Sequence, residues 1–307
     1  GVLAGLAACG LAPPTAAGQG DPPWSGLVEA LERHVEDLRS APDHAQSAVA
    51  EALDRRFLEE LRQRRLIDRT GLPDAGLVAL FDAAYTVAFY SGSPASADRL
   101  VALHHELRRR GAASADQARK VVRSLMVARQ FDRAGDLADA YELELAVPTM
   151  ARGDIRQDAP GVLRLTQART LVHESVDLAG LRLLVVGSPA CGFFRRAVDQ
   201  LPADPALAAW VQSHALVLLP ALEPPDPERL AEWNGQHPGL ELHVPYGADE
   251  WPWIRRWSTP GFYLLVDGVL QDHFIGWPDP DRLIRLRAMM SRSPAAAAPV
   301  WCPAAGR

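Results

Sequence analysis

The spacing of apolar residues changes once along this chain, and the change divides it into two parts. Between residues 22 and 147 apolar residues recur every third or fourth position, as in WSGLVEALERHVEDLRS at 24–40. This spacing places them along one side of an α-helix. After residue 163, apolar runs such as LRLLVV at 181–186 alternate with helical segments, a pattern typical of a mixed sheet with helices. We therefore predict an all-α N-terminal domain followed by an α/β C-terminal domain.

Composition sets the limits of these domains. The helical domain is predicted over 22–147 and the α/β domain over 163–292. Residues 148–162 contain Pro, Gly and Asp without a period, which indicates a linker. Within the α/β domain, DEWPWIRRW at 249–257 is expected to form a short helix. The low-complexity residues 293–307 are expected to form a mobile tail.

Charge and cysteine content exclude several classes of protein. The 307 residues are 48% hydrophobic and 23% charged, with a net charge of −6 and interleaved acids and bases. Proteins that bind nucleic acid usually present a basic face, so we predict no such partner. Three cysteines are too few for a disulfide-rich scaffold or a zinc site of paired CxxC motifs. Neither a phosphate loop nor histidines at metal-ligand spacing occurs, so we predict no metal and no cofactor.

The first 20 residues predict export. They are small and apolar, and no charge precedes Asp21, as in the apolar part of a secretory signal. LAAC at 6–9 resembles the bacterial lipoprotein cleavage box, in which the cysteine, here Cys9, is lipidated. An ordinary signal peptide with a chance cysteine stays open. Both interpretations predict a periplasmic protein, or one anchored in the membrane through Cys9 and facing the periplasm. No later segment has the ~18 consecutive apolar residues of a membrane span.

The helical domain contains two segments of similar shape. Residues 83–103 and 121–141 each combine a small, apolar helix, a short turn and a second helix with Ala and Leu spacing. Their offset of about 40 residues resembles that of tetratricopeptide-like helical hairpins, which implies a protein-binding role. An irregular helical bundle is the alternative.

Two motifs in the C-terminal part carry a family resemblance. DLAGLRLLVVGSPACGFFRRA at 177–197 places a turn, a strand and a cysteine loop before a helix, and WSTPGFYLLVDGVLQDHFIGW at 257–277 places Thr-Pro before a hairpin. Over about 160–292 the chain resembles thioredoxin-like proteins, specifically periplasmic thiol–disulfide oxidoreductases of the TlpA and cytochrome-maturation kind. The resemblance implies a thioredoxin fold. It also implies a cis peptide bond before Pro260.

The cysteine loop departs from the family pattern in one respect. By resemblance, Cys191 takes the place of the nucleophilic cysteine, and Gly192 and Phe193 fill the loop. Phe194 stands where the second, resolving cysteine is expected, and Arg195 matches the basic residue after it. The loop therefore holds one cysteine, and the two-cysteine exchange cannot occur within it.

The remaining site residues follow from the chemistry of a thiolate. The N-terminus of a helix, with Gly192 and Arg195 nearby, stabilises an anion at Cys191. The resemblance places Pro260 across from the thiol and leaves the Thr259 backbone free to pair with an extended peptide. Phe193, Phe194 and Trp257 are candidates for lining a peptide groove. The alternative is an inert cysteine covered by Phe194.

Two further questions stay open at this stage. Cys302 could resolve a mixed disulfide at Cys191, or it could be a stray cysteine in the tail. One of Glu232, Glu241 and Asp249 could be a buried acid near the thiol.

Three functions are therefore weighed. The first is thiol–disulfide exchange, or mixed-disulfide capture of a partner protein or extended peptide, through Cys191. The second is a non-catalytic adaptor with a degenerate thioredoxin-like domain. The third is a peroxidase, because Ser188 precedes Cys191 by three positions, as Thr or Ser does in peroxiredoxins. The proline expected four residues before Ser188 is replaced by Leu184.

Overall fold

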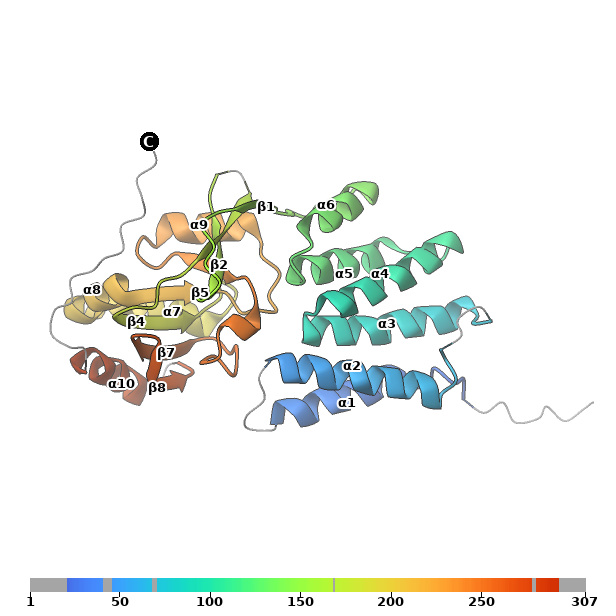
Figure 1. Cartoon of the computed structure of the whole chain (residues 1–307), viewed down its shortest axis with the longest axis horizontal. Helices are drawn as coiled ribbons and strands as arrows, with labels where there is room; N and C mark the ends of the chain where they lie inside the picture. The colour runs from blue at the N-terminus through green and yellow to red at the C-terminus, as the bar shows by residue number, and fades with distance from the viewer. Residues whose placement is uncertain (1–20, 41–45, 68–70, 168, 278–279, 293–307) are drawn as a thin grey trace, which may run out of the picture.

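The structure is a computed structural model that describes residues 21–40, 46–67, 71–167, 169–277 and 280–292. Cys9 and Cys302, with the predicted signal and tail, lie outside the described residues. The chain forms a helical domain and an α/β domain, as predicted (Figure 1). The helical domain contains α1 (Leu27–Ser40), α2 (Gln46–Gln63), α3 (Asp74–Ser91), α4 (Pro94–Arg109), α5 (Ala115–Val127) and α6 (Phe131–Ala140).

The helices of the first domain stack in chain order. Each helix packs on the next, and α3 also packs on α1 and α5, so the helices form a layered array (Figure 1). Residues in the left-handed backbone conformation end the helices and reverse the chain direction. They are Arg65, Gly92, Gly111, Arg129 and Glu142. The two segments predicted as similar form the α3–α4 and α5–α6 hairpins, with Gly92 and Arg129 in their turns. Within the described ranges, no helix combines the length and apolar character needed to cross a bilayer.

The second domain is built on a mixed sheet. Its strands are β1 (Thr149–Arg152), β2 (Gly161–Leu165), β3 (Thr170–Ser175), β4 (Leu181–Val186), β5 (Ala215–Leu218), β6 (Leu242–Pro245), β7 (Gly261–Val266) and β8 (Val269–Ile275). They lie in the order β1-β3-β2-β6-β5-β4-β7-β8. Strands β4, β5 and β6 are parallel, whereas β7 is antiparallel to both β4 and β8. The longer helices are α7 (Gly192–Gln200), α8 (Pro205–His214), α9 (Pro227–Gln236) and α10 (Pro280–Ser291).

The two faces of this sheet are covered differently. Alternate side chains, such as Leu183 and Val185 of β4, join a core with apolar residues of α7–α10. Those between them, such as Leu184 and Val186, pack against Trp251 and Ile254 from the segment after β6. Helices therefore cover one face, and an irregular, tryptophan-rich segment covers part of the other. This follows from the two-residue period of a strand.

Two predictions about this domain are wrong. The predicted linker, 148–162, contains β1, which pairs in parallel with β3 at the edge of the sheet. All four residues of β1 are exposed, so no apolar period revealed the strand. The predicted helix at 249–257 is reduced to a single turn, η2 (Ala248–Glu250). Pro252 disfavours helical backbone at the residue before it, which stops the helix there.

A half-buried arginine, Arg129, joins the two domains. Arg129, in the α5–α6 turn, sends its guanidinium to main-chain carbonyl groups of the α/β domain. Nη2 donates to the carbonyl of Pro245 at 2.6 Å and Nε to that of Tyr246 at 3.3 Å. Part of the side chain stays exposed, but the guanidinium is enclosed, and this burial lowers the pKa of Arg129 to about 10. It therefore stays charged at neutral pH, and carbonyl dipoles stabilise the charge.

The preceding hairpin turn makes a second contact with the α/β domain. Gly92 has a φ of +63°, and a Cβ placed on it would lie 2.5 Å from Cδ2 of Leu222. Only glycine suits this position, because it tolerates the left-handed conformation and leaves room for Leu222. The turns at Gly92 and Arg129 thus dock on the loops that follow β5 and β6.

We predict that Arg129→Ala lowers stability. The substitution leaves buried carbonyl groups without a donor, and losing hydrogen bonds to a charged group costs roughly 2–4 kcal/mol. Alanine and arginine share the cost of a positive φ, so the backbone contributes little to the difference. Urea unfolding followed by circular dichroism measures the change. Arg133→Ala is the control, because the contacts of exposed Arg133, with Asp98 and Gln130, stay within the helical domain. Equal stability of the two variants would contradict the role of Arg129.

Candidate functional site

The candidate site lies where β4 ends and α7 begins. Cys191 is the N-cap residue of α7, with an extended backbone, and no side chain caps the helix. A turn before it is closed by the amide of Cys191, which donates to the carbonyl of Ser188 at 2.9 Å. The thiol therefore lies at the N-terminus of α7, where the first N–H groups have no hydrogen-bond partner within the helix. These groups favour an anion.

The pairing of β4 with β7 brings a second loop to the thiol. Val186, the last residue of β4, lies opposite Gly261, the first of β7. The residues after β4 and before β7 therefore leave the sheet at the same place. The peptide bond between Thr259 and Pro260 is cis, and the carbonyl oxygen of Thr259 accepts from Sγ of Cys191 at 3.5 Å.

Cys191 is half-buried, and it is the one cysteine among the described residues. Arg195 is exposed and folds back over the loop, where its Nη1 donates to the carbonyl of Pro189 at 2.6 Å. Gly192 follows Cys191 directly, and a side chain built on it would meet only Arg195, at 4.0 Å. The thiol loop thus carries one positive charge and no bulky side chain at its first helical position.

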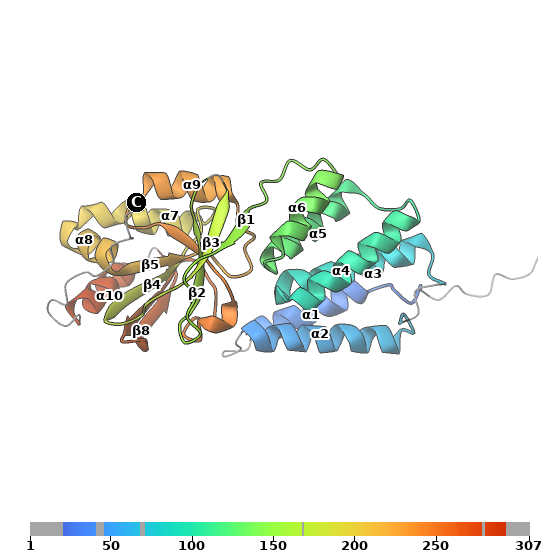
Figure 2. The ribbon, with the colours of Figure 1, turned by 45° about the horizontal axis from the view of Figure 1, so that its top comes forward.

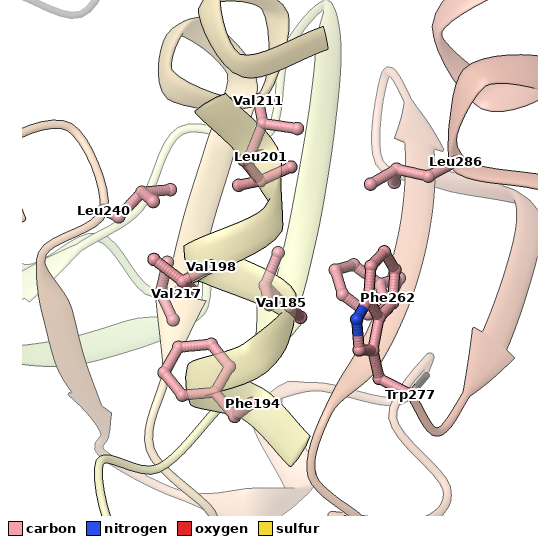
Figure 3. A pocket seen from close by; sticks show the side chains of 11 residues that line it. Val185, Phe194, Val198, Leu201, Val211, Val217, Leu240, Phe262, Trp277 and Leu286 are labelled. Carbon is pink, nitrogen blue, oxygen red and sulfur yellow. The ribbon is translucent and has the colours of Figure 1, made fainter. Parts of the chain in front are cut away.

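The two phenylalanines after Gly192 point to different surroundings. Phe193 is 52% exposed, whereas Phe194 is 1% exposed. The ring of Phe194 packs against Trp233, with centroids 5.0 Å apart, and borders an apolar cavity of about 20 Å³ in the core (Figure 3). A Cβ on Gly187 would lie 2.3 Å from this ring, which explains the glycine there. Phe194 is therefore a core residue, and Phe193 is the aromatic group available to a partner.

Trp257 is placed in a groove between the two domains. The groove has a volume of about 420 Å³ and runs from the helical domain to Ser258, the neighbour of Thr259. Its apolar lining includes Val35, Val49, Phe89, Tyr90, Leu222 and Trp257. The indole Nε1 of Trp257 is buried without a hydrogen-bond partner among the described residues. Trp257 therefore lines this groove between the domains.

Glu223, which the sequence did not indicate, contacts the loop that precedes Cys191. Ser188 is 3% exposed and donates its hydroxyl hydrogen to Oε1 of Glu223 at 2.8 Å. The same hydroxyl oxygen accepts from the amide of Ala190 at 3.2 Å. Burial is the main effect on this carboxyl and raises the pKa of Glu223, against the opposing effects of Ser188 and Arg229. Glu223 therefore holds the thiol loop from the segment after β5.

The acids proposed from the sequence lie elsewhere. Glu232 is on the exposed side of α9, Glu241 precedes β6, and Asp249 is in η2. The only signal for Glu223 is its position soon after the apolar run of β5. That signal is common in α/β domains and does not single out one residue.

Comparison of the chain with protein-family models, curated proteins and solved structures finds no match in any of the three. A thiol at a helix N-terminus, beside a main-chain carbonyl and an arginine, can act as a nucleophile once it loses its proton. The residues described around it include no group of three side chains that could hold a metal ion.

We predict that Glu223→Gln makes stability less dependent on pH. The folded-state pKa of Glu223 lies above its usual value of 4.5, so folding favours the protonated acid. Its stabilising contribution is present at low pH and is lost as pH rises through the folded-state pKa. Glutamine is uncharged throughout and still accepts from Ser188.

The variant should therefore melt higher than the parent at neutral pH and like it at a pH below 4.5. Melting temperatures measured across this range test the prediction. Glu232→Gln, on the surface of α9, is the control and should leave the pH profile unchanged. A profile of Glu223→Gln that parallels the parent at every pH would show that the buried carboxyl has no such effect.

Proposed function

We propose that this protein forms a mixed disulfide with a cysteine of a partner protein through Cys191, in a thioredoxin-like α/β domain. The single observation that carries the proposal is the placement of the thiol. Cys191 is half-buried at the start of α7, and its Sγ lies 3.5 Å from the carbonyl oxygen of Thr259, beside a cis-proline. The strands and α-helices follow the chain order β4–α7–α8–β5–α9–β6–β7–β8–α10, with β7 and β8 forming the final hairpin, and this order supports the thioredoxin-like assignment.

The chemical step is an exchange of sulfur partners. The Cys191 thiol loses a proton to solvent, and the thiolate attacks one sulfur of a disulfide in the partner. A bond forms between that sulfur and Sγ, and the partner's own disulfide breaks. The second partner sulfur leaves as a thiolate and takes up a proton. The second partner thiol can release the protein by the reverse attack, which re-forms the partner's disulfide and frees Cys191 as a thiolate. Alternatively, the thiolate of Cys302 attacks Sγ of Cys191, which forms a Cys191–Cys302 disulfide and releases the partner with both of its cysteines reduced.

The helical domain supports the selection of a polypeptide partner. The groove that ends at Ser258 is lined from both domains, and Phe193 lies exposed beside the thiol. An extended chain lying in the groove would pass the carbonyl of Thr259 before reaching Cys191. Apolar side chains of such a partner would find Phe89 and Phe193, which are 48% and 52% exposed. The composition of residues 1–20 supports a periplasmic location, with anchoring through Cys9 as part of the same proposal.

One observation favours the adaptor as a second candidate. Phe194 stands at the position of a resolving cysteine and is built into the core. A domain of this kind could bind a partner without exchanging disulfides. The two functions differ in the reactivity of Cys191.

We predict that folding accelerates the reaction of Cys191 with a disulfide. In a chain carrying Cys9→Ser and Cys302→Ser, the thiol should react with dipyridyl disulfide roughly two- to tenfold faster when folded than in urea, because the helix N-terminus stabilises the thiolate. Absorbance of the released thione gives the rate. A folded rate at or below the unfolded rate would contradict the exchange function and favour the adaptor. A faster reaction with hydrogen peroxide than with the disulfide would favour the peroxidase.

We predict that Arg195 contributes to this rate and that Arg196 does not. Arg195→Gln removes the charge held over the thiol loop and should slow the reaction roughly two- to threefold at low salt. Arg196 instead lies over the ring of Phe193, 5.9 Å from its centroid, so Arg196→Gln is the matched control. Equal rates for the two variants would show that Arg195 has no electrostatic role at the thiol.

A further inference from the structure

A second hollow lies on the sheet, at the end away from Cys191. It has a volume of about 290 Å³ and is bordered by the first residues of β5 and by His243 of β6. Strands β4, β5 and β6 are parallel, and Cys191 follows the far end of β4. The hollow is lined by Val162 and Leu216, which belong to the face without helices. It is therefore separate from the thiol site.

His243, a largely buried residue, provides the hollow with a hydrogen-bond acceptor. The residue is 6% exposed and borders the hollow. Its Nδ1 lies 3.0 Å from the carbonyl oxygen of Glu241. A carbonyl can only accept, so Nδ1 carries the hydrogen. Burial is the main effect on the imidazole and lowers the pKa of His243, so the ring is neutral at neutral pH. Its Nε2 then bears a lone pair, and Nε2 has no hydrogen-bond partner among the described residues.

His214 repeats this arrangement at the same hollow. It is the last residue of α8, and its Nδ1 lies 2.8 Å from the carbonyl oxygen of Trp210. The hydrogen again belongs to Nδ1, so Nε2 is the atom left for other contacts. Both histidines line the hollow. The hydrogen bonds at Nδ1 orient the two rings and do not involve Nε2 of either ring.

The charged groups around the hollow are mostly acidic. Glu174, Asp177 and Glu241 line it, against a single guanidinium, that of Arg182. Arg164 pairs with Glu174 at 2.6 Å. The charges of Glu174 and Glu241 act on His243 in the direction of a higher pKa, and that of Arg164 acts against them. Carboxylates therefore outnumber guanidinium groups along the lining of the hollow. The walls between these groups are apolar and include Val162, Val176, Ala215 and Leu216.

We propose that this hollow binds a primary ammonium group carried on a short aliphatic stem. One N–H of the ammonium donates to Nε2 of His243, the carboxylates of Glu241 and Asp177 balance its charge, and the stem lies against the apolar wall. A metal ion is the less fitting occupant, because the described residues contain no group of three His, Cys, Asp or Glu side chains able to hold one. The ammonium could come from a free amine or from the lysine side chain of a protein, which share this chemistry.

Titration of the full chain with n-pentylamine tests the proposal, followed by the NMR signals of the histidine rings. We expect saturable shifts of the His243 signals, with a Kd of about 1 mM or tighter. Pentanol, which has the same stem without the charge, should bind at least roughly tenfold more weakly. The second ligand to be titrated is Nα-acetyl-lysine amide, which keeps the side-chain ammonium of lysine. Binding of both amines indicates a site open to lysine side chains, and binding of pentylamine alone indicates a free amine.

Two variants test the site, one at a partly exposed residue and one at a buried residue, so that misfolding of the second does not prevent the test. Glu241→Gln removes one charge from a partly exposed position and should weaken pentylamine binding roughly tenfold. His243→Gln should do the same if it folds. Glu228→Gln, at a surface ion pair on α9, is the control and should bind like the parent.

Cys191→Ser should also bind like the parent, because this site does not depend on the thiol. Equal affinity for pentylamine and pentanol, unchanged affinity in Glu241→Gln, or saturable binding of Zn²⁺ at His243 without binding of the amine would overturn the proposal.

Discussion

The antiparallel pairing of β4 with β7 is the constraint on which the candidate site depends. The register that places Val186 opposite Gly261 fixes where both chains leave the sheet. One chain then turns through Ser188 into α7, and the other arrives through Pro260. Neither loop alone forms a site. Together they place a thiol, a helix N-terminus and a main-chain carbonyl within contact distance. Strands β4 and β7 are largely buried and each is paired on both sides, which restrains the positions of these groups.

The loop after β5 links this site to the helical domain. Leu222 packs against the turn at Gly92, and the next residue, Glu223, accepts a hydrogen bond from Ser188. Arg129 secures the neighbouring turn through main-chain carbonyl groups rather than through a carboxylate. Hydrogen bonds to main-chain carbonyl groups depend on the position of the backbone and not on which side chains those residues carry. The groove beside Ser258 exists because the two domains are held in this relation.

Local patterns in the sequence predict most of the helices and strands. The apolar run of β4, the Asp226 cap of α9 and the Asp267-Gly268 turn between β7 and β8 each have a physical signature, and each element is present. The Thr259-Pro260 bond is cis, as the resemblance implied. Strand β1 was missed because its exposed residues have no apolar period, and its pairing with β3 is the only thing that defines it. Glu223 and Arg129 were missed because their partners lie far away in the chain, 35 and 116 residues in the closest contacts.

The consecutive placement of Leu222 and Glu223 has a mechanical consequence. One peptide bond joins Leu222, which packs against the helical domain, to Glu223, which hydrogen-bonds the loop before Cys191. A displacement of Leu222 by the helical domain would therefore also move the carboxyl that holds Ser188.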